Sequence, residues 1–306
     1  MQNSEPQLLY PSDMSFTELL PSDIEEIRKN GICLKAQFFS LDDVRALHKT
    51  ALRMREYSIS NSIEARRWIL VSPIDVLRKS IKPHGYSDIK FLSKVALGCN
   101  FRGFATSYMS GAVHLDHILS IESPRSPKAI TAWHTDANSE GLHENFFTLK
   151  FFIYLNDISV KNGAFAYLRG SHRLVTKLRQ GINRKVIPYF RTASPRDLLE
   201  ACESPTVKSY LKNELSDAEL NGLCSQLATL RDDQPGDSSY DLTAPAGTLL
   251  VFDDRGVHRG GIPTDGHRSI LRYCYVLDEY NEMGYRRQIV NRLAKEILPG
   301  SIRKNW

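Results

Sequence analysis

Apolar positions repeat at helical spacing near both ends of the chain and at strand spacing in its middle. Near the N-terminus, the pattern predicts a helix over residues 21–29, a strand over 32–39 and a second helix from 40 to about 54. Ser22 can cap the first helix and Asn30-Gly31 can end it, while Ser40 with Asp43 resembles a capping box. The N-terminal part is therefore expected to be mainly helical.

From residue 101 onward, aromatic and β-branched segments alternate with Gly, Ser, Pro and Asn, which is typical of antiparallel strands. The predicted strands cover residues 101–109, 112–122, 129–136 and 146–155 and, after a long interruption, 248–253 and 269–277. Strands that leave and return in this way suit a double-stranded β-helix, the jelly-roll barrel of cupins. The predicted fold class is mainly β with flanking helices.

Residues 174–244 interrupt the strands with a helical pattern. Prolines that begin apolar segments at Pro195 and Pro205, and a capping box of Ser216 and Glu219, predict two or three helices. Insertions at the mouth of a barrel usually determine specificity, so we expect this segment to cover the substrate as a lid. The alternative is that it packs outside the barrel.

The length and composition predict one domain. With 306 residues, 42% hydrophobic and 25% charged, the chain can bury a sizeable core and is typical of a soluble globular protein. The expected parts of this single domain, residues 1–306, are N-terminal helices and first strands over about 20–100, a barrel core over 101–173 and 245–277, the helical insertion over 174–244, and a C-terminal helix and tail over 286–306, with an amphipathic helix at 288–298.

Charge and cysteine content exclude several classes of partner. The formal charge of +5 is equalled by residues 286–306 alone, which hold six basic residues and one acid, and this is too local for nucleic-acid binding. The five cysteines are scattered without a C-x-x-C pair, which favours a reduced, cytoplasmic setting. Residues 1–20 lack a basic residue, and no apolar run is long enough for a bilayer, so neither a secretory signal nor membrane attachment is expected.

Candidate metal ligands lie near the ends of predicted strands. His134 and Asp136 are two residues apart in an extended segment, so their side chains can point the same way and bind one ion. His258 can bring a third ligand from a distant strand. Two histidines and one carboxylate on one face of an octahedron suit a non-heme ferrous ion and leave the other face open for a co-substrate and oxygen. Arg268, ten positions past His258, has the planar fork that pairs with a carboxylate, such as the tail of a chelating 2-oxo acid.

The order of these motifs resembles that of the phytanoyl-CoA dioxygenase family of iron(II)/2-oxoglutarate oxygenases. Besides the residues just named, the motifs that carry the resemblance are FFTLKFFIYLND at residues 146–157, Asn162-Gly163-Ala164, Gly170-Ser171-His172-Arg173 and Gly247-Thr248. The resemblance runs from about residue 101 to about residue 276, more than half of the chain.

The resemblance implies an enzyme with a double-stranded β-helix that N-terminal helices brace. Its catalytic iron(II) would be held by His134, Asp136 and His258, and Arg268 would bind the 5-carboxylate of 2-oxoglutarate. Conversion of 2-oxoglutarate and oxygen to succinate and carbon dioxide would then accompany hydroxylation, or another oxidation, of an unactivated carbon. Related halogenases have a small residue where this chain has Asp136, which argues against halogenation.

The expected substrate is a small metabolite, as in a biosynthetic pathway, because no extensive basic surface for coenzyme A or a carrier protein is evident. The alternatives are the same chemistry on an acyl-CoA or carrier-bound substrate, and a barrel that binds a ligand without catalysis. A monomer or a homodimer is expected.

Other residues compete for the predicted roles. His114 and Asp116 have the same spacing as the chosen pair, but they lie inside a continuous predicted strand, whereas His134 leads into a polar turn. His172 is the competing third ligand, and Arg272, four residues past the chosen arginine, is the competing anchor for 2-oxoglutarate.

The position two residues past His258 departs from the family pattern. Many relatives carry a hydroxyl residue there that helps to hold 2-oxoglutarate, whereas this chain has Gly260, followed by a second glycine that permits close approach of the backbone to a ligand. A hydroxyl contact must therefore come from elsewhere. Thr131, three residues before His134, and Thr264 are the candidates, and Thr131 is the one expected on the inner wall.

Overall fold

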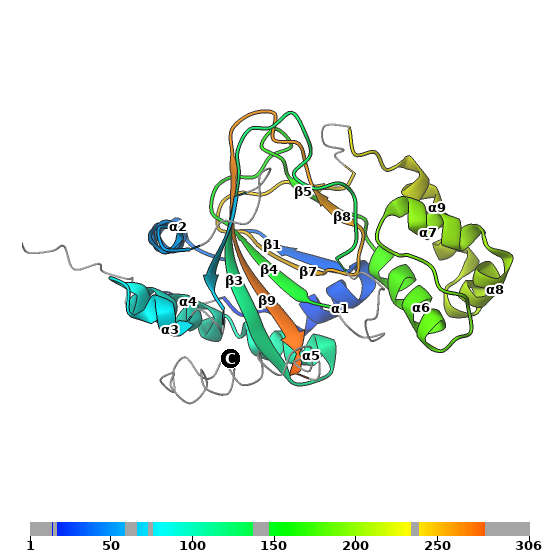
Figure 1. Ribbon diagram of the computed structural model, residues 1–306, viewed down its shortest axis with the longest axis horizontal. Helices are drawn as coiled ribbons and strands as arrows, with labels where there is room; N and C mark the ends of the chain where they lie inside the picture. The colour runs from blue at the N-terminus through cyan, green and yellow to red at the C-terminus, as the bar shows by residue number, and fades with distance from the viewer. Residues whose placement is uncertain are drawn as a thin grey trace, which may run out of the picture.

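Two antiparallel sheets face each other in the computed structural model, and helices pack around them (Figure 1). The structure describes Met14 and residues 17–58, 66–72, 76–136, 147–233 and 239–278. The larger sheet has the order β1 (Ile32–Lys35), β7 (Leu249–Asp253), β4 (Leu149–Tyr154), β9 (Arg268–Leu277), β3 (Val113–Ser123) and β2 (Arg66–Val71). The smaller sheet has the order β6 (Asp241–Leu242), β5 (Phe165–Tyr167) and β8 (His258–Gly260). These sheets confirm the predicted mainly β jelly-roll fold, although no closed barrel forms among the described strands.

Helices cover the outer face of the larger sheet. They are α1 (Pro21–Asn30), α2 (Leu41–Arg55), α3 (Val76–Ser80), α4 (Gly85–Gly98) and α5 (Phe101–Met109). Their apolar sides share one buried cluster with the outward-facing residues of β3, β4, β7 and β9. Within it, the Phe101 ring stacks on Phe151 with 4.5 Å between centroids. Burial of this face gives the site a rigid support on one side.

The prediction of a strand over residues 101–109 is wrong, because this segment is helix α5. Its buried residues Phe101, Phe104, Ala105 and Tyr108 follow the i, i+3, i+4, i+7 spacing of a helix. Their aromatic side chains suggested a strand by composition, but the spacing is the better guide to which backbone can bury them together on the sheet.

The inner faces of the two sheets meet in a second core. Phe165 of β5 lies 5.4 Å from Phe152 of β4 and 4.7 Å from Phe252 of β7, measured between ring centroids. Strand β7 reaches this position through a turn at Gly247, whose φ of +83° suits glycine. A Cβ there would lie 2.3 Å from the Phe39 carbonyl oxygen, so the turn also requires the missing side chain.

Three local predictions need correction. The strand predicted over 32–39 ends at Lys35, after which Phe39 donates its N–H to the Gly247 carbonyl at 2.9 Å. Ser22 does not cap α1: Pro21 occupies the first helical position, and Asp23 accepts from the Leu20 N–H at 2.8 Å. The predicted strand over 129–136 pairs only intermittently with β8 and the residue after it, through long bonds of 3.3 Å from Ile130 to Gly261 and 3.4 Å from Thr131 to Gly260, and one regular bridge.

The insertion is a compact helical unit beside the sheets (Figure 1). It has four helices in place of the two or three predicted: α6 (Ser171–Asn183), α7 (Pro195–Glu203), α8 (Pro205–Glu214) and α9 (Asp217–Thr229). Because α6 begins at Ser171, the predicted barrel core up to residue 173 extends slightly too far. The four helices share a buried cluster that also includes Trp133 and Val257. The insertion thus packs against the residues immediately before two of the predicted metal ligands, His134 and His258.

Some expectations concern residues outside the described ranges. These are the helix at 288–298, the tail up to residue 306, the polar turn after Asp136 and the first residue of the strand predicted at 146–155. Among the described helices, none is long and apolar enough to cross a membrane.

Candidate metal centre

Two histidines from distant parts of the chain form one backbone pair. His258 begins β8, and His134 bridges to it, so that each backbone N–H donates to the carbonyl oxygen of the other at 2.9 Å. The pairing places the imidazole rings side by side, with 4.5 Å between centroids. Asp136 is held two residues further on, where its N–H donates to the Asp254 carbonyl at 3.1 Å.

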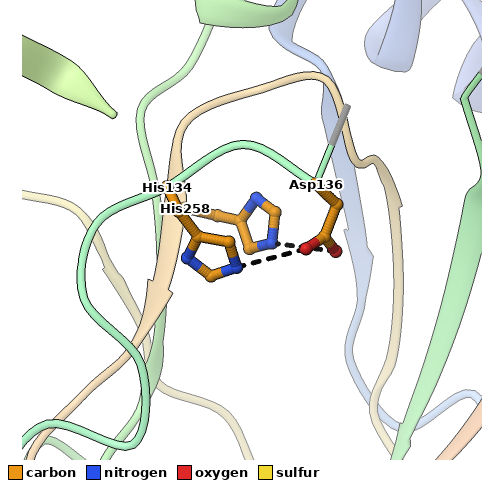
Figure 2. Close-up of side chains that lie close together, drawn as sticks. All are labelled: His134, Asp136 and His258. Atoms are coloured by element: carbon orange, nitrogen blue, oxygen red, sulfur yellow. Dashed lines mark ion pairs between the residues drawn. The ribbon is translucent and has the colours of Figure 1, made fainter. Parts of the chain in front are cut away.

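The three side chains converge (Figure 2). The Oδ1 atom of Asp136 lies 3.2 Å from His134 Nε2, and its Oδ2 atom lies 3.6 Å from His258 Nε2. One ligand atom from each residue can be chosen so that all lie within 4.8 Å of one another. The sequence therefore predicted a set of residues that the tertiary structure does bring together.

Hydrogen bonds orient both imidazoles for metal binding. His134 Nδ1 lies 2.7 Å from the Ala132 carbonyl oxygen, and His258 Nδ1 lies 2.8 Å from that of Gly256. A carbonyl oxygen can only accept, so each Nδ1 carries the proton and each Nε2 presents a lone pair to the cluster. Metal-bound histidines commonly have this arrangement, in which the second ring nitrogen donates to a backbone carbonyl.

The electrostatic environment favours the protonation states that a metal needs. Burial lowers the pKa of His258, which keeps its ring neutral. Burial also opposes ionisation of Asp136, but Lys150 and the two histidines hold its pKa well below the usual range. Asp136 lies deep in the protein, yet its side chain is 35% exposed because it borders an open pocket. Burial alone would lower the pKa of His134, but the Asp136 carboxylate raises it, so protons compete with a metal for this ring as pH falls.

Lys150 is the functional candidate that the sequence analysis missed. It lies on β4 with only 7% of its side chain exposed, and it contacts Asp136 Oδ2 and, at 3.3 Å, Asp254 Oδ2. Burial would lower its pKa, but the two carboxylates raise it. A signal was present, since Lys150 is the one charged residue in the apolar run at 146–155. Its ammonium holds two carboxylates together at the edge of the predicted metal site.

We expect Lys150→Met to lower the free energy of unfolding of the metal-free protein by about 3 kcal/mol, because it leaves two neighbouring carboxylates without their cation. Urea unfolding measures the change. The matched control is Lys177→Met, which breaks the more exposed 2.7 Å pair with Glu214 and should cost less than about 1 kcal/mol. Equal losses in the two variants would contradict this role of Lys150. Added Ni²⁺ should restore part of the lost stability, since the ion replaces the missing positive charge.

Arg268 lies in the same pocket as the three ligands, at the start of β9. Its side chain is buried, its Nη1 donates to the Gly163 carbonyl at 2.8 Å, and its Nη2 lies 3.5 Å from Ser123 Oγ. Its Nε is buried with no hydrogen-bond partner, and it forms no ion pair with any described residue. Burial lowers the pKa of Arg268 to about 10. A buried cation in this state calls for an anionic ligand.

Gly260 makes room for Arg268. A Cβ at Gly260 would lie 2.9 Å from the Cβ of Ile130 and 3.1 Å from Arg268 Nη2. The sequence predicted that the backbone here approaches a ligand. At Gly260, the atoms that the backbone approaches are instead those of Ile130 and Arg268. Thr131 lines the pocket and its Oγ1 accepts the Gly260 N–H at 2.8 Å, so its own hydroxyl proton is available to a ligand. Thr264 is exposed and lies 3.2 Å from the Lys161 carbonyl, outside the pocket lining.

The rival histidines lie elsewhere. His114 Nδ1 contacts Asp278 Oδ1 at 2.8 Å, and His172 Nε2 lies 3.1 Å from the Arg28 carbonyl, so neither meets the cluster. His117 reaches the pocket wall indirectly, through a 3.2 Å contact with Arg272, which lines the pocket. His267 is exposed.

No described residue of the insertion lines this pocket. The insertion instead holds the segment that carries the first ligands: Thr135 donates to the carbonyls of Thr192 and Ala193, and the Trp133 N–H donates to Asp232 at 2.7 Å. This bracing agrees with the alternative that the helices pack outside the sheets, and the predicted lid stays a prediction.

Two facing antiparallel sheets, a pocket with two histidines and one carboxylate, and a buried arginine beside them together define a non-heme iron, 2-oxoglutarate-dependent oxygenase. The sequence profile of the family described as "Phytanoyl-CoA dioxygenase (PhyH)" matches residues 27–269, and the chain belongs to this family. The predicted enzyme class and its need for iron and 2-oxoglutarate are thereby confirmed.

Among solved structures, several are similar to this chain. The epimerase SnoN, in complex with Fe3+, alpha ketoglutarate and nogalamycin RO, is 14% identical, with 84% of this chain and 82% of that chain covered and a TM-score of 0.50. The carbocyclase SnoK from nogalamycin biosynthesis is 16% identical, with 85% and 84% covered and a TM-score of 0.48. HygX from Streptomyces hygroscopicus, with nickel, 2-oxoglutarate and hygromycin B bound, is 14% identical, with 85% and 88% covered and a TM-score of 0.49. No curated protein matches the sequence.

Proposed function

We propose that His134, Asp136 and His258 hold the ferrous ion, that Arg268 binds the 5-carboxylate of 2-oxoglutarate, and that the enzyme hydroxylates a small metabolite. The donor set fits the metal, because both Nε2 atoms and a carboxylate converge while both Nδ1 atoms are tied to backbone carbonyls. When bound, ferrous iron chelated by 2-oxoglutarate supplies the activation of oxygen, with succinate and carbon dioxide as products.

The observation that carries the co-substrate assignment is the buried guanidinium of Arg268. A planar fork without a carboxylate partner, in the pocket of the metal ligands, is suited to bidentate pairing with a carboxylate. Thr131 supports the same end of the pocket, because its hydroxyl is held by the Gly260 N–H and can donate to that carboxylate. These contacts would determine how long a 2-oxo acid can be to fit between Arg268 and the metal.

The remaining residues exclude water and orient the ligands. Phe152, Phe165 and Phe252 give part of the pocket wall an apolar surface, which strengthens the polar contacts made beside it. Asp136 would supply a carboxylate ligand to the iron, and this supports hydroxylation over halogenation. The insertion would act on the substrate indirectly, through the segment it braces at Trp133 and Thr135. A reduced, cytoplasmic setting stays part of the proposal.

We expect the purified protein, supplied with iron(II) and 2-oxoglutarate, to release succinate slowly in the presence of oxygen. The release should rise when the right small metabolite is added, because substrate binding couples oxygen use to oxidation of the substrate. Succinate is measured by mass spectrometry against a panel of metabolites, with heat-treated protein and an anaerobic sample as controls. Absence of oxygen-dependent succinate release under every condition would refute the proposed function.

A further inference from the structure

The pocket holds more positive charge than the metal chemistry accounts for. Among its lining residues are the cations Lys150, Arg268 and Arg272, against a single carboxylate, Asp136. Lys150 is neutralised by Asp136 and Asp254. Arg268 is assigned to 2-oxoglutarate by the function proposed above. Arg272 forms no ion pair with a described carboxylate, and its Nη2 contacts His117 Nε2. Burial would raise the pKa of the neighbouring Cys274 thiol, but Arg272 and His117 lower it to about 7.

A hydrogen-bonded chain on β3 orients Arg272. Its Nη2 lies 3.2 Å from His117 Nε2, and His117 Nδ1 lies 2.6 Å from Asp116 Oδ2. A guanidinium can only donate, so His117 Nε2 accepts and the histidine proton is on Nδ1, where it is donated to Asp116. The arginine is thus fixed by one nitrogen, while its Nε is buried without any partner. A guanidinium that is oriented in this way can bind a ligand. The residues that orient it, Asp116 and His117, belong to the rival motif that the predicted metal site does not use.

Arg272 and Arg268 serve different positions in the pocket. They face the same side of β9, four residues apart, which separates their Cα atoms by about 13 Å. Arg268 turns toward Ser123, its cross-strand partner at the start of β9. Arg272 turns toward His117, which pairs with Cys274 further along, and Cys274 in turn pairs with Lys150 beside Asp136. The two guanidinium groups therefore turn toward different polar partners at different positions along β9.

We propose that Arg272 binds a carboxylate group of the substrate, so that the enzyme acts on a small carboxylic acid. This inference rests on the proposed function, because it assumes that Arg268 is taken by the co-substrate. His117 is a positioning residue that holds the guanidinium with its remaining N–H groups toward the pocket. Phe152, the cross-strand neighbour of Arg272, gives the acid an apolar surface beside its charged group.

The test compares small aliphatic, aromatic and amino acids with their carboxamides as stimulators of succinate release by the iron(II)- and 2-oxoglutarate-loaded enzyme. At least one acid should stimulate release well above its carboxamide, since the amide lacks the charge that pairs with Arg272. In Arg272→Gln this stimulation should require about tenfold to a hundredfold more acid, the loss expected for a charge-assisted hydrogen bond. Arg272→Lys should recover part of it. Stimulation is the readout because an acid that merely displaced 2-oxoglutarate would inhibit.

Two further variants make the test specific. His117→Phe removes the acceptor that orients the guanidinium, and should reduce the preference for acid over amide by a smaller factor than Arg272→Gln. Arg169→Gln, at an exposed arginine outside the pocket, should leave the preference unchanged.

Three results would overturn the inference. The first is that no acid exceeds its carboxamide. The second is that the Arg272→Gln variant keeps the preference for an acid over its carboxamide. The third is that Arg272→Gln raises the KM for 2-oxoglutarate as much as Arg268→Gln, which would assign both arginines to the co-substrate. Absence of oxygen-dependent succinate release in the unmodified enzyme would instead refute the proposed function, so the two failures are distinguishable.

Discussion

Replacing His258 with alanine is expected to reduce oxygen-dependent succinate release by more than about a hundredfold. Loss of a group that merely hydrogen-bonds a metal ligand costs about tenfold to a hundredfold in metal affinity, and His258 would itself be a ligand. The variant leaves His134 and Asp136 as a two-ligand site. Iron bound per chain after anaerobic loading, measured together with succinate release, shows whether the activity is lost through the metal.

The controls for His258→Ala are the two rival histidines. His114→Ala and His172→Ala remove buried rings that contact Asp278 and the Arg28 carbonyl, so they are matched in size and burial but lie away from the cluster. Both should keep bound iron, whatever they cost in stability. Retained iron in His258→Ala combined with its loss in His172→Ala would move the third ligand to His172.

Arg268→Lys is expected to weaken 2-oxoglutarate binding about tenfold to a hundredfold. A charge-assisted pair is worth about 1.5–3 kcal/mol, and a lysine ammonium retains the charge but not the planar fork. The shorter head group would also lose the 2.8 Å bond to the Gly163 carbonyl that orients the guanidinium. The dependence of succinate release on 2-oxoglutarate concentration measures the effect.

Arg272→Lys is the matched comparison for Arg268→Lys, because both residues lie on the same strand and line the same pocket. It should change the KM for 2-oxoglutarate little compared with Arg268→Lys. If Arg268→Lys left that KM untouched while Arg272→Lys raised it, the assignment of the anchoring arginine would be reversed.

Periodicity predicted most of the architecture because strands and helices at a packed interface must bury every second residue or one helical stripe. The strands at 113–123, 149–154, 249–253 and 268–277 all fall within about three residues of the expected bounds. The capping box of Ser40 and Asp43 is present, with Asp43 donating its N–H to Ser40 Oγ at 3.2 Å. The aromatic helix at 101–109 was mistaken for a strand because composition was weighed above spacing.

The candidate ligands could be chosen from sequence because their chemistry and order are local properties, whereas the contacts that prepare them are not. The choice of His134 over His114 followed from the polar turn after it, and the structure agrees in bringing only His134 to His258 and Asp136. The contact of Lys150 with Asp136 and that of Arg272 with His117 join residues on different segments, so no spacing along the chain could have shown them.

By itself, the sequence determined the family, the class of chemistry and a small set of candidate ligands for iron and a dicarboxylate, since these depend on residue type and order. Only the tertiary structure decided which side chains meet and that Gly260 leaves space for Arg268. It also decided that Lys150 and Arg272 both line the pocket, where Lys150 pairs with carboxylates and Arg272 contacts a histidine. The physical reason is that desolvation and pairing are set by neighbours across strands, and those neighbours are fixed by register in three dimensions.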